Sequence, residues 1–387
     1  MEQTDAYTIM SSPGALPTDA LSLLVAEDAY SAWLLDQFGV LHDGVDPYDH
    51  AIDLVRKLKE EKQARLVILT NSARSAPHTY KRLEGMGFKR EWFCGVATSG
   101  DVCTRVLSLT PGQHDDKLLP REHPLWKDIS GRNISEEGKR KGKRKRRCLH
   151  FTWSKFDKVT GIDLDALDIE VTTDPEQADF VLVHWMDCIA LEGNQELRKV
   201  SEEDIEDLLA QCAKFSLPML VANPDIVACK GEALLPMPGS LAVKYKELGV
   251  PIEKIHLLGK PSPIMYNYAK GKTDVRECVR APVPGCLLTC FFFFLFPLNE
   301  PPFFVLDSFL SDVPKSEIIA VGDSLEHDIK GACTWEVDSA FITRGIHCND
   351  LHECEIPEDM WVNKDELEKL CLEHNADPTI CSEFFGL

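Results

Sequence analysis

The stretch SAWLLDQFGVLHDG, residues 31–44, decides how the rest of the chain is interpreted. It opens with an apolar run, Ala32 to Leu35, which ends in Asp36, and Gly39 follows three residues later. An apolar run bounded in this way is typical of a buried strand that passes into a turn. The pattern predicts a strand that delivers one carboxylate to a loop at its C-terminal end, and Asp36 is the candidate nucleophile.

The residues that follow predict a βαβ unit. Residues 49–62 carry apolar side chains at i, i+3, i+4 and i+7, which indicates an amphipathic helix. RLVILT, residues 65–70, has no alternation, as expected for a parallel strand that is covered on both faces. We therefore expect an α/β fold with a parallel sheet.

A polar cluster, Thr70, Asn71 and Ser72, comes directly after the second strand, and Ser75 with Pro77 has the residue types of a helix N-terminus. Hydroxyl and backbone N–H groups at such a place favour an anion site. An ordinary turn followed by a helix cap explains the same residues equally well.

The composition excludes some classes of function. Of the 387 residues 44% are hydrophobic, and 42 Lys and Arg against 63 Asp and Glu give a net charge of -21, which disfavours a nucleic-acid partner. The 14 cysteines include no CxxC pair, and the opening MEQTDAYTIMSS does not resemble a signal or transit peptide. These features predict reduced thiols and a cytoplasmic protein, with an organellar location left open.

The second half of the chain predicts further α/β structure. DFVLVHW, residues 179–185, and MLVAN, residues 219–223, have the composition of buried strands, and a helical pattern begins at Glu202. HLLGKPSP, residues 256–263, places Lys260 just past another short strand. We expect this lysine at the C-terminal edge of the same sheet.

The last strong strand, EIIAVGD, ends in Asp323, and Asp328 follows five residues later. Four predicted strands thus end in Asp36, Thr70, Lys260 and Asp323. The carboxyl ends of parallel strands meet at one edge of a sheet, where ligands bind. The four side chains are therefore expected to converge.

A carboxylate, a hydroxyl, an ammonium and a second acid suit a phosphate ester with a divalent cation. Mg²⁺ prefers oxygen ligands and takes one or two carboxylates, which Asp36 and Asp323 could supply. Lys260 and Thr70 would hold phosphate oxygens. Asp36 could then attack phosphorus and form an aspartyl-phosphate that water hydrolyses.

Four segments, in chain order, resemble motifs I to IV of the haloacid dehalogenase superfamily: LLDQFGVLHDG, LVILTNSARS, GKPSP and AVGDSLEHD. The long segment between the second and third motifs, with ANPD at 222–225 and PGSLA at 238–242, resembles class IIA, the nitrophenylphosphatase and sugar-phosphatase type. The resemblance implies a Rossmann-like parallel core, an inserted α/β cap of the C2 type that selects the substrate, and Mg²⁺-dependent hydrolysis of a small phosphorylated metabolite.

The resemblance also implies roles for individual residues. Asp36 and Lys260 would be catalytic, with Asp36 as nucleophile and Lys260 stabilising the phosphoryl charge. The remaining roles are phosphate binding by Thr70, Asn71 and Ser72, metal binding by Asp36, Asp323 and the backbone carbonyl of Phe38, and support by Asp328 and His42.

One position departs from the family pattern. Phosphatases of the superfamily carry a second Asp two positions after the nucleophile, as the acid and base of the reaction, and this chain has Phe38 there. General acid–base help is typically worth 10² to 10⁴-fold, or roughly 3 to 5 kcal/mol of barrier.

Several interpretations of Phe38 stay open. His42 or Asp43 could supply the acid, or the substrate could have a good leaving group. The bond cleaved could be something other than a phosphomonoester. Alternatively, the chain is a weakened hydrolase that binds phosphate and Mg²⁺ in a regulatory role.

Two segments interrupt the predicted elements. Residues 130–147 form a basic insertion, expected to be a solvated loop, with a polyanion-binding or nuclear-localisation role as the lesser alternative. Residues 270–304 are an insertion or a retained intron, since deleting them would join 263–269 to 305–310 as one helix. Their apolar part, Cys286 to Phe296, is shorter than the about 20 residues of a membrane span, so no membrane partner is expected and an anchoring hairpin is the lesser alternative.

The expected organisation is a core formed by residues 20–104 and 221–387, with the cap at 105–220. A separate zinc site at His347, Cys348, His352 and Cys354 is a weak alternative, because the spacing matches no tight zinc motif. The sequence names neither the substrate nor the oligomeric state, and a homo-oligomer is left open.

Overall fold

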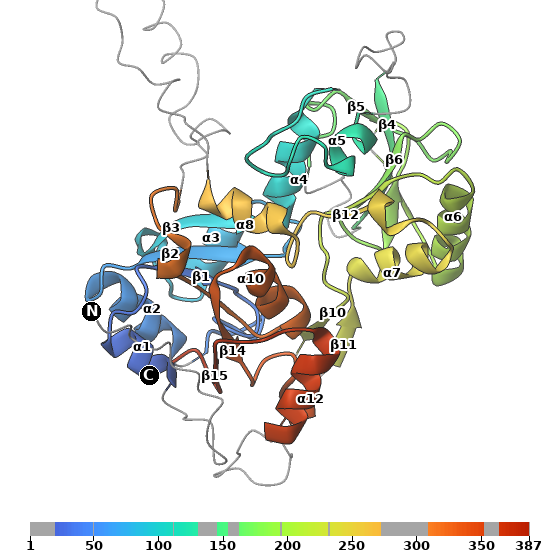
Figure 1. Ribbon diagram of the computed structural model, residues 1–387. Coiled ribbons are helices and arrows are strands. Elements are labelled where there is room, and N and C mark those ends of the chain that lie inside the picture. Colours follow the sequence, from blue (N-terminus) through green and yellow to red (C-terminus); the bar gives the residue numbers. More distant parts are fainter. Residues whose placement is uncertain are drawn as a thin grey trace, which may run out of the picture.

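The computed structural model shows two α/β units, each built on its own sheet (Figure 1). It describes residues 20–48, 50–110, 112–130, 145–153, 162–193, 196–230, 233–271, 309–351 and 364–386. The predicted fold class, a Rossmann-like parallel core with an additional α/β cap, is confirmed.

The first sheet has the strand order β15-β14-β13-β1-β2-β3, and every pair in it is parallel. Its strands are β1 (Ala32–Leu35), β2 (Arg65–Thr70), β3 (Phe93–Thr98), β13 (Ile318–Gly322), β14 (Asp338–Ile342) and β15 (Ile380–Ser382). The central strands β1 and β13 are buried throughout, because helices cover both faces of the sheet.

Two apolar clusters hold these helices to the first sheet. One face carries α1 (Ala20–Ala26), α2 (Ala51–Glu60) and α3 (Ala76–Gly85), and the other carries α4 (Ser99–Ser108), α8 (Pro263–Lys270) and α10 (Lys330–Trp335). A short π-helical turn, η5 (Leu325–Ile329), follows β13, and α11 (Cys348–Leu351) and α12 (Lys364–His374) pack near it. The predicted helix at 49–62 is thus present as α2.

The second sheet has the order β12-β9-β6-β4-β7-β8, with β5 also paired to β4. Its strands are β4 (Arg146–Thr152), β5 (Ile169–Val171), β6 (Phe180–Val183), β7 (Cys188–Ala190), β8 (Leu197–Lys199), β9 (Met219–Val221) and β12 (Ile255–Leu257). Two helices, α6 (Glu202–Lys214) and α7 (Gly239–Glu247), pack on one face. A separate hairpin, β10 (Val227–Lys230) with β11 (Ala233–Pro236), lies between β9 and α7 in the sequence.

Strand β12, which precedes Lys260, belongs to this second sheet and pairs with β9. The prediction that Lys260 follows a strand of the same sheet as Asp36 is therefore wrong. A three-residue apolar strand fits either sheet, and nothing in its own sequence chooses between them. The second sheet consequently includes residues beyond the boundary predicted at residue 220.

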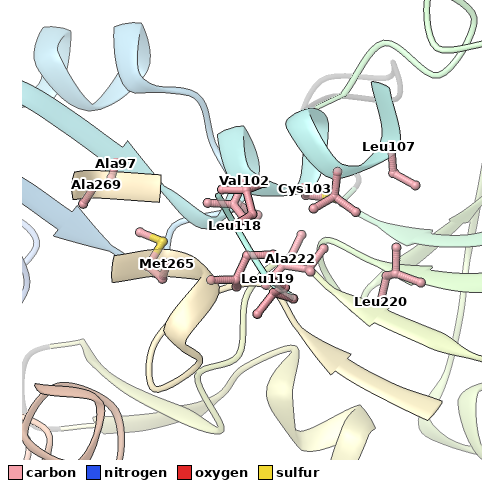
Figure 2. Close-up of a cluster of buried hydrophobic side chains, with 14 of the residues drawn as sticks. Ala97, Val102, Cys103, Leu107, Leu118, Leu119, Leu220, Ala222, Met265 and Ala269 are labelled. Atoms are coloured by element: carbon pink, nitrogen blue, oxygen red, sulfur yellow. The ribbon is translucent and has the colours of Figure 1, made fainter. Parts of the chain in front are cut away.

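A continuous cluster of buried apolar side chains joins the two α/β units (Figure 2). It includes Val102 and Cys103 of α4, Met265 of α8 and, from the second sheet, Leu220 and Ala222. All of these side chains are less than one tenth exposed, so the cluster is a core rather than a loose contact. It fixes the loop between β12 and α8, which carries Lys260.

The end of the basic segment is structured, which corrects the predicted solvated loop. Arg146 and Arg147 are the first residues of β4, and Arg146 is only 4% exposed. Its guanidinium group donates to the carbonyl oxygens of Leu107 at 2.7 Å, Leu167 at 3.2 Å and Ile129 at 3.3 Å. Arginine presents several donors in one plane, so it can bind three chain segments where a charge count indicates only solvation.

The other unusual segments lie mostly outside the described residues. This holds for 131–144 in the basic run and for 272–308, which include the predicted insertion and its apolar part. Helix α8 ends at Lys270, and Gly271, which follows it, has a φ of +56°. Within the described ranges, no helix is both long enough and apolar enough to cross a membrane.

We expect Arg146→Met to destabilise the protein by about 3 kcal/mol, because three carbonyl groups, two of them in buried hydrogen bonds, would lose their donor. The matched control is Arg147→Met, since Arg147 is the next residue in the strand but is partly exposed and pairs with Glu170 at 3.1 Å. Chemical denaturation would measure both changes. Equal stability of the two variants would contradict a structural role for Arg146.

Candidate active site

A buried lysine lies between two carboxylates at the C-terminal edge of the first sheet. Lys260 Nζ is 2.9 Å from Asp36 Oδ1, at the end of β1, and 2.6 Å from Asp328 Oδ1, in η5. The side chains of Lys260 and Asp328 are 3% and 5% exposed, and that of Asp36 is 13% exposed. An ammonium group buried to this degree requires opposite charge close by, and the two carboxylates supply it.

A third carboxylate, that of Asp323 at the end of β13, completes the group. One oxygen from each of Asp36, Asp323 and Asp328 lies within 4.8 Å of the others. Gly39, with a φ of +75°, passes so close that a Cβ atom there would lie 1.8 Å from Asp323 Oδ2. Glycine is therefore required at this turn both by the backbone conformation and by the carboxylate beside it.

The donor set of this site fits a small divalent cation. Three carboxylates face one ammonium group, and the backbone N–H groups of Ile346 and Ser324 donate to Asp323 Oδ2 at 2.8 Å and Asp328 Oδ2 at 3.1 Å. Clustered carboxylate oxygens are the ligands that Mg²⁺ prefers in proteins. In the part of the chain that the structure describes, no other group of acids, histidines or cysteines is close enough to hold a metal ion.

The uncompensated charge alters the ionisation of these acids. Burial raises the pKa of Asp36 from 3.8 to about 7, Lys260 opposes this rise, and Asp328 adds to it. Burial and the charges of Asp36 and Asp328 also hold the pKa of Asp323 well above its ordinary value. For Lys260, burial would lower the pKa, but Asp328 and Asp36 outweigh burial and raise it, so the lysine stays charged.

Thr70, the last residue of β2, contacts Gln37, the residue after Asp36, and its hydroxyl group is held by two donors. Gln37 Nε2 donates to Thr70 Oγ1 at 2.7 Å, and the backbone N–H of Ser72 donates to it at 3.2 Å. The oxygen of Thr70 is thus occupied as an acceptor, while its own proton is left to donate. Gln37 is 2% exposed, and the sequence analysis missed it because nothing in its surroundings distinguishes it from a loop residue.

The side chain of Asn71, predicted to bind phosphate, holds the backbone of Lys260 instead. Its Oδ1 accepts from the N–H of Lys260 at 2.7 Å, and its Nδ2 donates to the carbonyl of Lys260 at 3.1 Å and to Asp225 Oδ1 at 2.8 Å. Asp225, which follows β9, is therefore a second residue that the sequence analysis did not assign. Its only signal was the ANPD segment, which carried no role of its own.

His42 and Asp43, the two candidate substitutes for the missing acid, do not have the surroundings of a proton donor. Burial lowers the pKa of His42 to about 4, its Nδ1 accepts from the N–H of Gly44, and its Nε2 is buried with no partner among the described residues. Asp43 is exposed, and its Oδ1 accepts from the N–H groups of Val45 and Asp46. Neither side chain is set up as a proton donor at neutral pH.

The alternative zinc site gains no support. His347 Nδ1 lies 3.3 Å from Asp350 Oδ2, and its ring packs against those of Phe341 and His374. His352 and Cys354 lie outside the described residues.

Without divalent cations, we expect the stability of the protein to fall as the pH rises from about 4 to about 7. The folded pKa of Asp36, about 7, lies above its ordinary value of 3.8, so the folded state binds the proton more tightly in this range and loses that advantage on ionisation. Melting temperatures in EDTA between pH 5 and pH 8 would measure the slope. Asp36→Asn should flatten it, whereas the exposed control Asp53→Asn should not, and an unchanged slope in Asp36→Asn would contradict the assignment.

Solved structures with the same fold cover nearly the whole chain. They include a haloacid dehalogenase-like hydrolase from Brucella suis 1330 (TM-score 0.54, 23% identity, 88% of this chain and 92% of that one). A possible sugar phosphatase from Cytophaga hutchinsonii has a TM-score of 0.56 at 14% identity, covering 95% and 97% of the two chains. A 4-nitrophenylphosphatase from Thermotoga maritima has a TM-score of 0.50 at 17% identity, covering 93% and 96%.

Sequence comparison identifies the family. No curated protein matches the chain significantly. Residues 33–120, which contain Asp36 and Thr70, match the family model described as haloacid dehalogenase-like hydrolase. Residues 257–365, which contain Lys260, Asp323 and Asp328, match a second model of the same superfamily, described as HAD-hydrolase-like. The chain belongs to the haloacid dehalogenase-like hydrolases.

Proposed function

We propose that the protein is a Mg²⁺-dependent, class IIA phosphatase that acts on a small phosphorylated metabolite, with Asp36 as the nucleophile. The observation that supports this most strongly is the contact of Lys260 with both Asp36 and Asp328, beside the carboxylate of Asp323. It combines a nucleophile, a fixed positive charge and a set of cation ligands within one edge of the sheet.

In the proposed reaction, an Asp36 oxygen attacks phosphorus, and the bond from phosphorus to the leaving oxygen breaks. The leaving group departs with the electron pair. Water then attacks the phosphorus of the aspartyl-phosphate, which releases phosphate and restores Asp36. Lys260 offsets charge on the phosphoryl oxygens, and the free proton of the Thr70 hydroxyl group is available to one of them.

Asp36, Asp323 and the backbone carbonyl of Phe38 are the proposed ligands of Mg²⁺. Asp328 supports the site through its contacts with Lys260 and with the N–H of Ser324. When bound, Mg²⁺ supplies positive charge against the phosphoryl oxygens and orients them. Thr70 and Ser72 remain proposed phosphate contacts, and for Asn71 the backbone rather than the side chain is the available group.

Phe38 sets the limit of this activity. The side chains predicted as substitutes for the missing acid are a buried, neutral His42 and an exposed Asp43 that is engaged in a turn. A substrate whose leaving oxygen is already a good leaving group needs no protonation, so such substrates are favoured. Hydrolysis of the aspartyl-phosphate would also lack a base and would be slow.

The same observation favours one alternative function. A site that binds phosphate and Mg²⁺ but turns over slowly would serve as a sensor or regulatory protein. The proposed phosphatase would act on a small molecule in the cytoplasm, and a homo-oligomer is compatible with this function.

Activity against p-nitrophenyl phosphate with Mg²⁺ tests the nucleophile and the missing acid. Asp36→Asn should abolish turnover, and Phe38→Asp should raise it by about tenfold to hundredfold, because it restores the base that activates water in the slow second step. Phe38→Asn is the matched control, since it removes the ring without adding an acid, and it should give no such rise. Equal turnover by the wild-type protein and Asp36→Asn would exclude Asp36 as nucleophile.

A thermal shift experiment tests the metal site without turnover. Asp323→Asn should stabilise the protein in EDTA by about 1 kcal/mol, because it removes one of three repelling buried carboxylates. Mg²⁺ should raise the melting temperature of the wild-type protein but not of this variant. A variant that still responds fully to Mg²⁺ would show that Asp323 is not a ligand.

A further inference from the structure

Two half-buried arginines, Arg74 and Arg82, follow the polar cluster at the end of β2, and Arg82 contacts the loop after Asp36. Arg82, in α3, places its Cζ atom 4.7 Å from the ring centroid of Phe38, two residues after Asp36. Arg74 lies four residues after Thr70 in the loop that follows β2, and its Cζ atom is 5.9 Å from the ring centroid of Trp153, at the end of β4. One guanidinium group thus contacts the nucleophile loop, and the other contacts the second sheet.

Among the described residues, neither guanidinium group has an acidic partner. Arg82 donates to the carbonyl of Gly44, and Arg74 contacts His78 Nε2, but no ion pair joins either one to a carboxylate of the described residues. Other arginines in those ranges do form such pairs: Arg56 with Asp53, Arg65 with Asp312, Arg105 with Asp115, Arg147 with Glu170, and Arg344 with Glu383. In a chain with a net charge of -21, the lack of an acid at this place is informative.

The two charges also oppose each other. Burial lowers the pKa of both arginines, and the charge of Arg74 contributes to lowering that of Arg82. Burial and the charges of Arg74, Arg82 and Lys81 lower the pKa of His78, so this side chain stays neutral and adds no counter-charge. Two half-buried cations with no carboxylate partner in the described ranges are unfavourable, and an anion between them would relieve the repulsion.

We propose that Arg74 and Arg82 bind a second oxyanion of the substrate, a carboxylate or a further phosphate, while Lys260 and Thr70 hold the phosphoryl group that is cleaved. This inference rests on the proposed function and names the class of its substrate. The planar guanidinium fork matches the two oxygens of such a group, and the rings of Trp153 and Phe38 lie within cation–π distance of Arg74 and Arg82. Phe38 then has a positive role, because it supports Arg82 where the family has its second Asp.

Paired substrates test this inference. Glycerol 3-phosphate and 3-phosphoglycerate differ by a carboxylate, and fructose 1-phosphate and fructose 1,6-bisphosphate differ by a second phosphate. Within each pair, the ratio compares kcat/KM of the member with two anionic groups to kcat/KM of the member with one. In Arg74→Gln and Arg82→Gln, this ratio should fall about tenfold or more in at least one pair. The pair affected identifies the oxyanion as a carboxylate or a phosphate.

Arg90→Gln is the matched control, since Arg90 stacks on Tyr80 at 4.5 Å but is exposed on the protein surface. Arg74→Lys and Arg82→Lys keep the charge without the fork and should lose less than the Gln variants. Ratios that are unchanged in both Gln variants, or that fall equally in Arg90→Gln, would overturn the inference.

Binding to the Asp36→Asn protein separates this inference from the proposed function, since binding requires no turnover. Calorimetric titration should show tighter binding of the member of a pair that has two anionic groups. Arg74→Gln in the same background should remove the difference. If the wild-type protein hydrolyses nothing but shows this Arg74-dependent preference, the proposed function fails and the second-oxyanion site stands. If hydrolysis proceeds without any preference in binding, the reverse holds.

Discussion

The ion pairs of Lys260 with Asp36 and Asp328 are the contacts on which the rest of this structure depends. A buried ammonium group must be placed within about 3 Å of its partners to offset the loss of hydration. Here the lysine arrives from a strand of the second sheet, while both acids belong to the first. The side chain of Asn71 and the apolar cluster around Met265 and Ala222 keep the two sheets in the register that this contact requires. The chemistry of the site therefore depends on the packing between the two α/β units.

The sequence was sufficient to predict the parts of the site that local patterns determine. Asp36, Thr70 and Asp323 each follow a strongly apolar strand, and parallel strands bring such ends together whatever the rest of the chain does. The sheet that contains β12 could not be predicted, because a three-residue strand pairs wherever an edge is available. The role of Arg146 was hidden for a similar reason, since its partners are carbonyl groups of distant segments that leave no mark in the sequence.

Phe38 links the departure from the family pattern to the surrounding structure. Its ring packs against His42, with 4.6 Å between the ring centroids, and lies under the guanidinium group of Arg82. The position therefore does more than lack an acid. Its ring supports Arg82, one of the two arginines that we propose bind a second oxyanion. Weak acid–base help and recognition of a second anion would be two consequences of one residue.

In the proposed reaction Asp36 becomes phosphorylated. Since Phe38 leaves the second step without a base, the phosphoryl-enzyme should accumulate when the leaving group is good. Rapid acid quenching after mixing with Mg²⁺ and p-nitrophenyl phosphate, followed by peptide mass spectrometry, measures this directly. We expect a peptide that contains Asp36 and has gained one phosphoryl group, and no such peptide from Asp36→Asn. Release of nitrophenol with this peptide unmodified at every time point would contradict it.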